Sequence, residues 1–289
     1  SLLRRFCYTR PDMRKCRKIL LAFRLAYSSN RNYLKGIARY LAHAKDWRVS
    51  IPEQFYDFSA QDLSGGLRDE YDGIITVVPH DPAVVADLDR IGLPIVILGS
   101  TGDDLPPVKR NVALIRTDNS LIGELAARHF LSLGQFRSYA FIASNPSTAW
   151  SDQRYEGFAK VLAQHSCRAA FVKSSFPAGS LKDIAFIREQ LAKLPKPAAV
   201  FVAFDQRATQ TLQACEDGGL AVPKDVQLIG VDNDPIFCDF SRPTLTSIAT
   251  NQVRQGEVAA IELERLLMRR SSGRKSIVLK NAEIIERES

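Results

Sequence analysis

The chain has 289 residues, of which 45% are apolar and 25% are charged. These values are typical of a soluble globular protein whose core is large enough for two lobes. No apolar run approaches the roughly 20 residues of a membrane-spanning helix, and the first residues lack the apolar block of a secretory signal. The sequence therefore predicts neither a membrane span nor a signal peptide.

The net charge of +7 raises the question of nucleic acid as a partner. Part of the excess lies in two basic groups: Arg4, Arg5, Arg10, Arg14, Lys15, Arg17 and Lys18 near the start, and Arg265, Arg269, Arg270, Arg274 and Lys275 near the end. Neither group has the interleaved aromatic residues of single-strand binders. We expect both to be solvated, and direct DNA contact by this chain is the less favoured alternative.

The five cysteines, Cys7, Cys16, Cys167, Cys215 and Cys238, are scattered, and no two have CxxC spacing. This pattern argues against a disulfide framework and against a zinc site. A reducing, cytoplasmic compartment fits it best, and we expect neither a metal nor a cofactor.

Strand-like and helix-like segments alternate along the chain from Lys18 onward. In the first part, apolar runs predict strands at 18–23, 47–52, 73–78, 94–99 and 111–118. Helical spacing of apolar residues predicts helices at 31–44 and at 82–92, the second ending at Gly92.

The same order then begins again. Helices are predicted at 120–134, 151–165, 181–194 and 205–219, and strands at 138–143, 169–176, 198–204 and 226–231. We expect Ser151 to cap the helix that it begins, and Gly218-Gly219 to end the helix at 205–219. Apolar strands separated by helices predict parallel sheets that are covered on both faces.

The last part adds a β-like segment at 245–250, a long amphipathic helix at 251–270 and a single last strand at 276–285. A chain that recrosses between two lobes needs such pieces. We predict an α/β fold of two doubly wound parallel-sheet lobes with a hinge. The expected parts are a basic arm at 1–17, an N-terminal lobe at 18–117 plus 251–272, and a C-terminal lobe at 118–250 plus 273–289.

Motifs of common enzyme classes are absent from the sequence. There is no GxSxG elbow, no GxxxxGK[ST] loop and no HExxH, and the histidines (His43, His80, His129 and His165) are isolated. We therefore predict no catalytic residues and no enzymatic activity.

Polar residues follow several of the predicted strands. In LIGVDNDP (228–235), Asp232 and Asn233 come directly after an apolar run. They could form only a turn, or they could face the crevice where parallel sheets bind ligands at the carboxyl ends of their strands. By the same placement, the candidate ligand residues are Asp232, Asp205, Arg154, Trp150, Arg31, Asn30 and Phe176.

This mixture of side chains suits a sugar. A carboxylate accepts from neighbouring hydroxyls, Arg donates in a fork, and a flat aromatic ring covers the C–H face of the sugar. Alternatives stay open for each residue: Asp205 could cap the helix that follows it, Arg154 could form a surface ion pair, and Trp150 and Phe176 could belong to the core.

Three stretches, IGVDNDP, SDQRYEGF and TLTSIATNQVRQGEVAAIELERLL, resemble the periplasmic-binding-protein fold of lactose-repressor-type regulators. A narrower resemblance is to the sugar-sensing domain of AraC-type xylose operon regulators. It rests on Trp150 four residues before Arg154, the Asp-x-Arg of Asp205 and Arg207, Cys215-Glu216, Asp232-Asn233, and Ile285-Glu286-Arg287 near the end. Asn30 departs from it, because an Asp is expected before Arg31.

The resemblance covers nearly the whole chain from Lys18. It implies a type I periplasmic-binding-protein-like fold, a xylose or related pentose bound between two lobes, and a helix-turn-helix DNA-binding domain outside this chain, beyond Ser289. We therefore predict the effector-binding domain of a cytoplasmic, homodimeric, sugar-responsive transcriptional regulator. An exported sugar-binding component of a transporter is the alternative, and an enzyme of nucleotide or sugar metabolism is a third.

Overall fold

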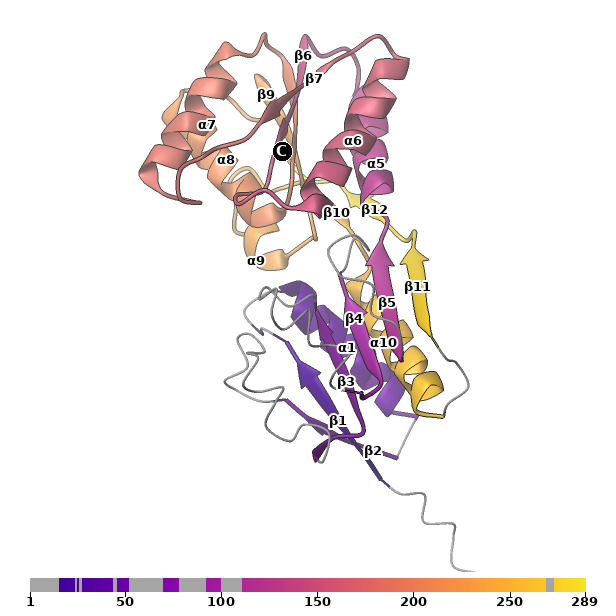
Figure 1. Ribbon diagram of the computed structural model, residues 1–289. Coiled ribbons are helices and arrows are strands. Elements are labelled where there is room, and N and C mark those ends of the chain that lie inside the picture. The colour runs from indigo at the N-terminus through magenta and orange to yellow at the C-terminus, as the bar shows by residue number, and fades with distance from the viewer. Residues whose placement is uncertain are drawn as a thin grey trace, which may run out of the picture. The chain divides into compact units, whose positions relative to one another are not determined.

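The computed structural model of the protein describes residues 16–23, 25, 28–43, 46–51, 70–77, 92–99, 111–268 and 273–289 (Figure 1). Two predicted segments lie largely outside these residues: the basic arm, except for its last two residues, and the helix at 82–92, except for Gly92. The chain divides into two compact units. Unit 1 comprises Ser1–Gly99, Leu105–Ile115 and Val253–Ser276, and unit 2 comprises Ser100–Asp104, Arg116–Gln252 and Ile277–Ser289.

The sheet of unit 1 has the strand order β11-β5-β4-β3-β1-β2. Its strands are β1 (Arg17–Ala22), β2 (Trp47–Ser50), β3 (Gly73–Val77), β4 (Ile95–Leu98), β5 (Val112–Thr117) and β11 (Arg274–Leu279). The pairs among β1 to β5 are all parallel. Leu21, Ile75, Val96 and Ala113 stand in register across four of these strands and are all buried, as expected for a sheet that is covered on both faces.

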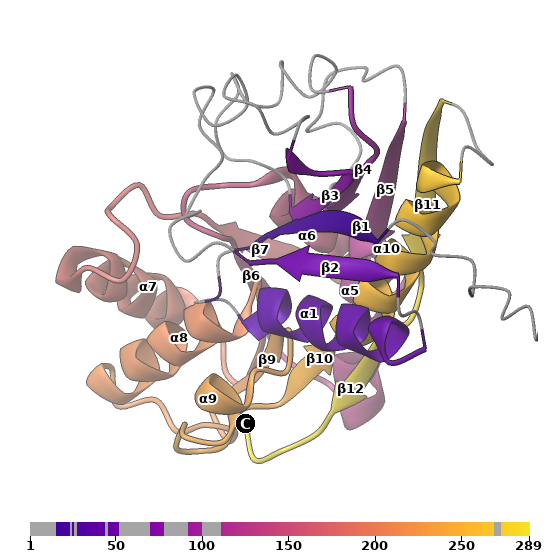
Figure 2. The same cartoon turned by 90° about the horizontal axis from the view of Figure 1, so that it is seen from below.

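Helices α1 (Ser28–Leu41) and α10 (Gln252–Leu267) pack backbone to backbone in unit 1. A Cβ atom on Gly36 would lie 1.9 Å from the carbonyl oxygen of Val253, and one on Gly256 would lie 2.0 Å from that of Tyr33. Only glycine permits so close an approach. Figure 2 shows α1 running alongside β1 and β2.

The sheet of unit 2 has the order β12-β10-β9-β8-β6-β7. Its strands are β6 (Ser138–Ile142), β7 (Ala169–Val172), β8 (Ala198–Val202), β9 (Val226–Val231), β10 (Ser247–Ala249) and β12 (Glu283–Ile285). All the pairs from β7 to β10 are parallel, whereas β12 runs antiparallel to β10. With the sheet of unit 1, this confirms the predicted α/β class with two parallel-sheet lobes.

Two pairs of helices cover the two faces of this sheet (Figure 1). They are α5 (Asn119–Leu133) with α6 (Ala149–Gln164), and α7 (Leu181–Lys193) with α8 (Asp205–Asp217); a short helix, α9 (Pro235–Cys238), follows β9. Phe130 and Phe158 pack with Phe141 and Phe201 of the sheet in one core cluster. Ile187 and Leu212 pack with Val200 in a second cluster on the other face.

The prediction that Ser151 caps its helix was wrong. Helix α6 begins earlier, at Ala149, and its N-cap is Thr148. Ser151 is fully buried instead, and its hydroxyl accepts a hydrogen bond from the Ser144 N–H at 3.0 Å. The side chain therefore fastens the loop between β6 and α6.

The prediction of a single last strand at 276–285 was also wrong. Residues 274–279 form β11 in the sheet that contains β5, and residues 283–285 form β12 in the other sheet. Residues 280–282 separate them, and an apolar pattern alone could not show this change of partner. The predicted strand at 169–176 is shorter as well: β7 ends at Val172, so Phe176 lies in a loop.

Candidate functional site

The candidate site in unit 2 lies where the parallel strands end at their carboxyl edge. Asp232 follows β9 directly, and both Asp232 and Asn233 have positive φ values, of 102° and 49°. The Asp232 N–H donates to the carbonyl of Ile248 at 2.9 Å, and its Oδ1 accepts from Nε2 of Gln252 at 3.3 Å. Non-glycine residues rarely adopt such φ values, so the surrounding bonds hold this loop in place.

Burial raises the pKa of the Asp232 carboxyl group, the positive charge of Arg154 lowers it, and the negative charge of Asp234 raises it again. Asp232 and Arg154 are therefore close enough to act on each other electrostatically. The turn alternative and the ligand alternative for Asp232 are compatible, since the side chain sits in a turn beside a cationic group.

Arg154, in α6, is buried and donates hydrogen bonds to two groups of unit 2. Its Nε donates to Oδ1 of Asn119 at 3.1 Å, and its Nη1 donates to the carbonyl of Ala203 after β8. The guanidinium carbon lies 4.7 Å from the centre of the Trp150 ring, a cation–π arrangement. The alternative of a surface ion pair does not describe this side chain.

The two aromatic candidates have different surroundings. Trp150 is half-buried, packs against the core cluster on the α5–α6 face and meets the Phe204 ring edge-on at 6.0 Å. Phe176 is 36% exposed in the loop after β7, and its ring lies 6.2 Å from that of Phe186. Phe176 is thus not a core residue, and Trp150 combines core packing with a place beside Arg154.

Asp205 is the first residue of α8, but the N-cap of this helix is Phe204. The Asp205 carboxylate reaches across to other elements: Oδ1 accepts from the Ser247 hydroxyl at 2.6 Å, and Oδ2 accepts from the Asp234 N–H at 2.8 Å. Burial, and then the charge of Asp232, raise the pKa of Asp205 to about 8. Asp205 therefore bonds within unit 2 rather than capping α8.

Asn30 and Arg31 belong to unit 1, in the first turn of α1. Asn30 is buried, and Nη1 of Arg31 donates to the carbonyl of Leu25 at 2.6 Å. In unit 2, the structure brings together Asp232, Arg154 and Trp150, with Asp205 behind the loop that carries Asp232. Direct ligand contact by any of the candidate residues stays a prediction.

Two residues of this site were missed in the sequence: Gln252, which bonds Asp232, and Asn119, which bonds Arg154. A signal for Gln252 was present, because it follows β10 of the same sheet by three residues, and the rule that found Asp232 applies to it. Asn119 follows β5 by two residues, but β5 belongs to the sheet of unit 1, so this rule does not place Asn119 beside Arg154. Arg287 was not a candidate either, yet its Nη2 donates to Oδ1 of Asn233 at 2.9 Å.

Arg207, the second residue of the Asp-x-Arg motif, points away from this site. Its Nη2 donates to Oδ1 of Asp183 at 3.0 Å and its Nη1 donates to Oδ2, so a fully buried ion pair joins α7 and α8. Burial alone would raise the pKa of Asp183, but bonds from Arg207, Ser174 and the Gly179 N–H hold it below its usual value. Since Gly179 precedes α7, the pair also ties down the loop that contains Phe176.

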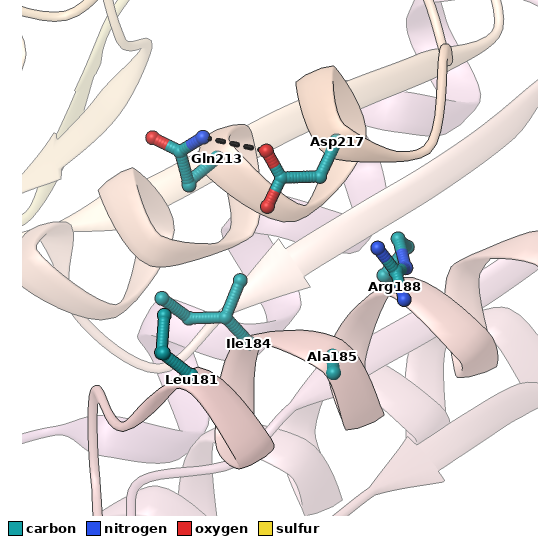
Figure 3. A pocket seen from close by; sticks show the side chains of 6 residues that line it. All are labelled: Leu181, Ile184, Ala185, Arg188, Gln213 and Asp217. Atoms are coloured by element: carbon teal, nitrogen blue, oxygen red, sulfur yellow. Dashed lines mark hydrogen bonds between the residues drawn. The ribbon is translucent and has the colours of Figure 1, made fainter.

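A surface groove of about 520 Å³ lies between α7 and α8. Leu181, Ile184, Ala185, Arg188, Gln213 and Asp217 line it, and Figure 3 shows the hydrogen bond from Gln213 to Asp217. None of the candidate ligand residues lines this groove. It is therefore separate from the carboxyl edge where Asp232 and Arg154 lie.

The described residues include no group of three or more His, Cys, Asp or Glu side chains that could hold a metal ion. Among the helices in the described part of the chain, none is long and apolar enough to cross a membrane.

Residues 127–289, more than half of the chain, match the family described as the periplasmic binding protein-like domain. The chain belongs to this family. The match includes the site residues from Trp150 to Gln252, and the predicted type I periplasmic-binding-protein-like fold is confirmed.

Relatives of this family member are transcriptional regulators. This chain is 28% identical over 286 residues to the xylose operon regulatory protein of Escherichia coli (strain K12), and the alignment covers 95% of this chain and 70% of that protein. It is 26% identical over 184 residues to the ribose operon repressor of Halalkalibacterium halodurans, covering 63% of this chain and 52% of that one.

A solved structure, the xylose-binding transcription activator xylR, matches with a TM-score of 0.79 and 26% identity, covering 94% of this chain and 69% of that one. These homologues are sugar-responsive regulators and not enzymes, which supports the effector domain of a regulator.

Proposed function

We propose that this chain is the effector-binding domain of a transcriptional regulator that responds to xylose or a related pentose. The observation that carries the proposal is the meeting of Asp232, Arg154 and Trp150 at the carboxyl edge of the unit 2 sheet. An acceptor, a donor and an aromatic face are the groups with which a protein recognises a sugar.

The hydrogen bonds of Asp232 leave it able to accept more. Its Oδ1 accepts from Gln252, and an ionised carboxylate has about four acceptor positions in all. Its second oxygen is therefore suited to accept from a sugar hydroxyl. The Arg154 guanidinium lies over the Trp150 ring, so the two side chains hold each other in orientation before a ligand arrives.

The choice of a pentose rests on the relatives, which are named for xylose and ribose. Asn30 stands where the resemblance leads us to expect an Asp, which is a difference at a predicted contact in unit 1. An amide presents both a donor and an acceptor, whereas a carboxylate only accepts. This position can therefore favour another pentose over xylose.

The proposal extends to the whole regulator. An attached helix-turn-helix domain of the AraC type would contact DNA, and the protein would act in the cytoplasm as a homodimer. The names of the relatives, an operon regulatory protein and a transcription activator, support the role in transcription. The effector would act by binding one conformation more tightly than the other, which shifts their populations. A transporter component would share this fold, but the relatives favour a regulator.

Calorimetric titration and thermal unfolding test the proposal with D-xylose, D-ribose, L-arabinose, D-glucose, a nucleoside and a purine. At a hundredfold excess over the Kd, a sugar that binds only the folded state adds about 2.7 kcal/mol of stability. We expect an aldopentose to give this shift, Asp232→Ala to abolish it, and Asp217→Asn, at the exposed end of α8, to retain it. A shift with the purine and with no sugar would reject a sugar effector.

A further inference from the structure

We propose that Asp205 acts on the sugar site indirectly. Its hydrogen bonds fix the loop that carries Asp232, and they fix it more firmly when Asp205 is a neutral acid than when it is a carboxylate. Asp205 is then a positioning residue rather than a ligand contact. The proposal deepens the proposed function, and only its sugar-binding assay depends on that function.

The loop after β9 needs such a support because its backbone is strained. Asp232 and Asn233 both have positive φ values, which residues other than glycine disfavour. The next amides are held by hydrogen bonds: the Asn233 N–H donates to the Ser247 hydroxyl at 3.0 Å, and the Asp234 N–H donates to Oδ2 of Asp205 at 2.8 Å. Ser247 in turn donates to Oδ1 of Asp205 at 2.6 Å. Both bonds therefore lead to the one carboxyl group.

The surroundings of Asp205 leave no place for a sugar. The residue is 2% exposed, and the Cys238 thiol lies 3.4 Å from Oδ2 as a further donor. A Cβ atom on Gly230 would come within 2.3 Å of Oδ1, so the carboxyl group rests against the bare backbone of β9. With every side occupied by protein, Asp205 can influence a ligand only through the loop.

The charges near Asp205 favour its neutral form. Asp232 and Asp234 face it from the loop, Cys238 faces it from α9, and Ser247 of β10 is uncharged. In the described part of the chain, the nearby cations act on neighbours: Arg154 on Asp232, Arg287 on Cys238, and Arg207 of its own helix on Asp183.

Burial and the charge of Asp232 place the pKa of Asp205 at about 8. In the neutral acid the bond to Ser247 can reverse, so that the Asp205 O–H donates to the Ser247 hydroxyl oxygen while the other carboxyl oxygen still accepts from the Asp234 N–H. Above that pH the negative charge of the Asp205 carboxylate repels that of Asp232, which works against the closed position of the loop.

A measurement that needs no ligand tests whether Asp205 fixes the loop after β9. Amide hydrogen exchange of the peptide at 230–238 is compared at about pH 6 and about pH 9, after correction for intrinsic rates, in wild type and variants. We expect exchange in wild type to quicken about tenfold at the higher pH, exchange in Asp205→Asn to stay slow at both, and exchange in Asp205→Ala to be fast at both. Asp217→Asn, a matched change at the exposed end of α8, should behave as wild type.

Titration of D-xylose over the same pH range tests the effect on the sugar site. Asp205→Ala should weaken binding about tenfold, and Asp205→Asn should restore it and remove the pH dependence seen in wild type. The proposal is overturned if Asp205→Ala exchanges as slowly as wild type in this peptide, or if Asp205→Asn keeps the wild-type pH dependence. If Asp205→Ala does not fold, the comparison of Asp205→Asn with wild type decides. If no sugar binds wild type, the proposed function fails, and hydrogen exchange still decides on Asp205.

Discussion

Gly123 of α5 lies directly against the backbone of Arg154 in α6: a Cβ atom at position 123 would come within 1.9 Å of the Arg154 carbonyl oxygen. The contact is reciprocal, because a Cβ atom on Gly157 would lie 2.0 Å from the carbonyl oxygen of Ser120. The helix that carries Trp150 and Arg154 is thus positioned by two glycines, in the way that Gly36 and Gly256 position α1 and α10 in unit 1.

Gly123→Ala should force α5 and α6 apart. Overpacking of this kind costs about 1–3 kcal/mol, and here the added atom meets backbone, which cannot rotate away. We expect a lower Tm and weaker sugar binding, because Arg154 moves relative to Asn119. Ser132→Ala, at an exposed position of the same helix, should change neither. Urea unfolding and calorimetry measure both effects, and a Gly123→Ala variant as stable as wild type would contradict the close packing.

Asp232 and Asp234 should respond differently to substitution. Asp232→Asn replaces an acceptor oxygen by a donor and should lower sugar affinity by about 1.5–3 kcal/mol, or roughly tenfold to a hundredfold, with little change in stability. Asp234 caps α9 by accepting from the Ile236 N–H at 3.1 Å, so Asp234→Ala should cost about 0.5–2 kcal/mol of stability. Equal sugar affinities for wild type and Asp232→Asn would mean that Asp232 is only a turn residue.

The stability of the protein should fall with rising pH because of Asp205. Its pKa in the folded protein, about 8, lies above the ordinary value of 3.8, so the folded state holds the proton more tightly than the unfolded chain. The stability that this group contributes is complete below about pH 4 and is lost as the pH rises through about 8, at no more than about 1.4 kcal/mol per pH unit.

Urea unfolding of wild type and Asp205→Asn between about pH 4 and about pH 9 measures this contribution. The wild-type curve should fall relative to that of the variant and become parallel to it above about pH 8. Asp232, whose pKa burial also raises, acts with the same sign and is present in both proteins. Parallel curves throughout would show that Asp205 takes up no extra proton on folding.

Removing one charge of the buried Asp183–Arg207 ion pair should lower the stability of the protein strongly, whereas replacing both residues by apolar ones should lower it little. Asp183→Asn leaves a buried guanidinium without its counter-charge, which typically costs about 3–5 kcal/mol. The double variant Asp183→Leu with Arg207→Met removes both charges and should recover most of that loss. Chemical denaturation of the three proteins gives the comparison. A double variant less stable than Asp183→Asn would mean that the polar bonds to Gly179 and Ser174 dominate.

Much of the fold could be predicted because its signals are local. Strands that are buried on both faces consist of consecutive apolar residues, as at 95–98, and helices show their own spacing. Boundaries were less predictable: Ser151 looks like a cap, but Thr148 takes that position and Ser151 bonds the Ser144 amide instead. The predicted strand at 276–285 is divided between two sheets: β11 pairs with β5 and β12 pairs with β10. This pairing depends on where the tertiary structure places β5 and β10, which the residues at 276–285 do not show.

The sequence by itself determined that Asp205 and Asp232 reach the carboxyl edge of the unit 2 sheet, because a residue that follows a parallel strand emerges at that edge. It could not determine which groups each of these side chains contacts. Asp205 and Asp232 follow neighbouring strands, yet one turns inward to Ser247 and the other lies near Arg154. Only the tertiary structure decided this, since Ser247 and Arg154 come from elements distant in the chain, and a buried carboxyl group turns toward whichever donors those elements place beside it.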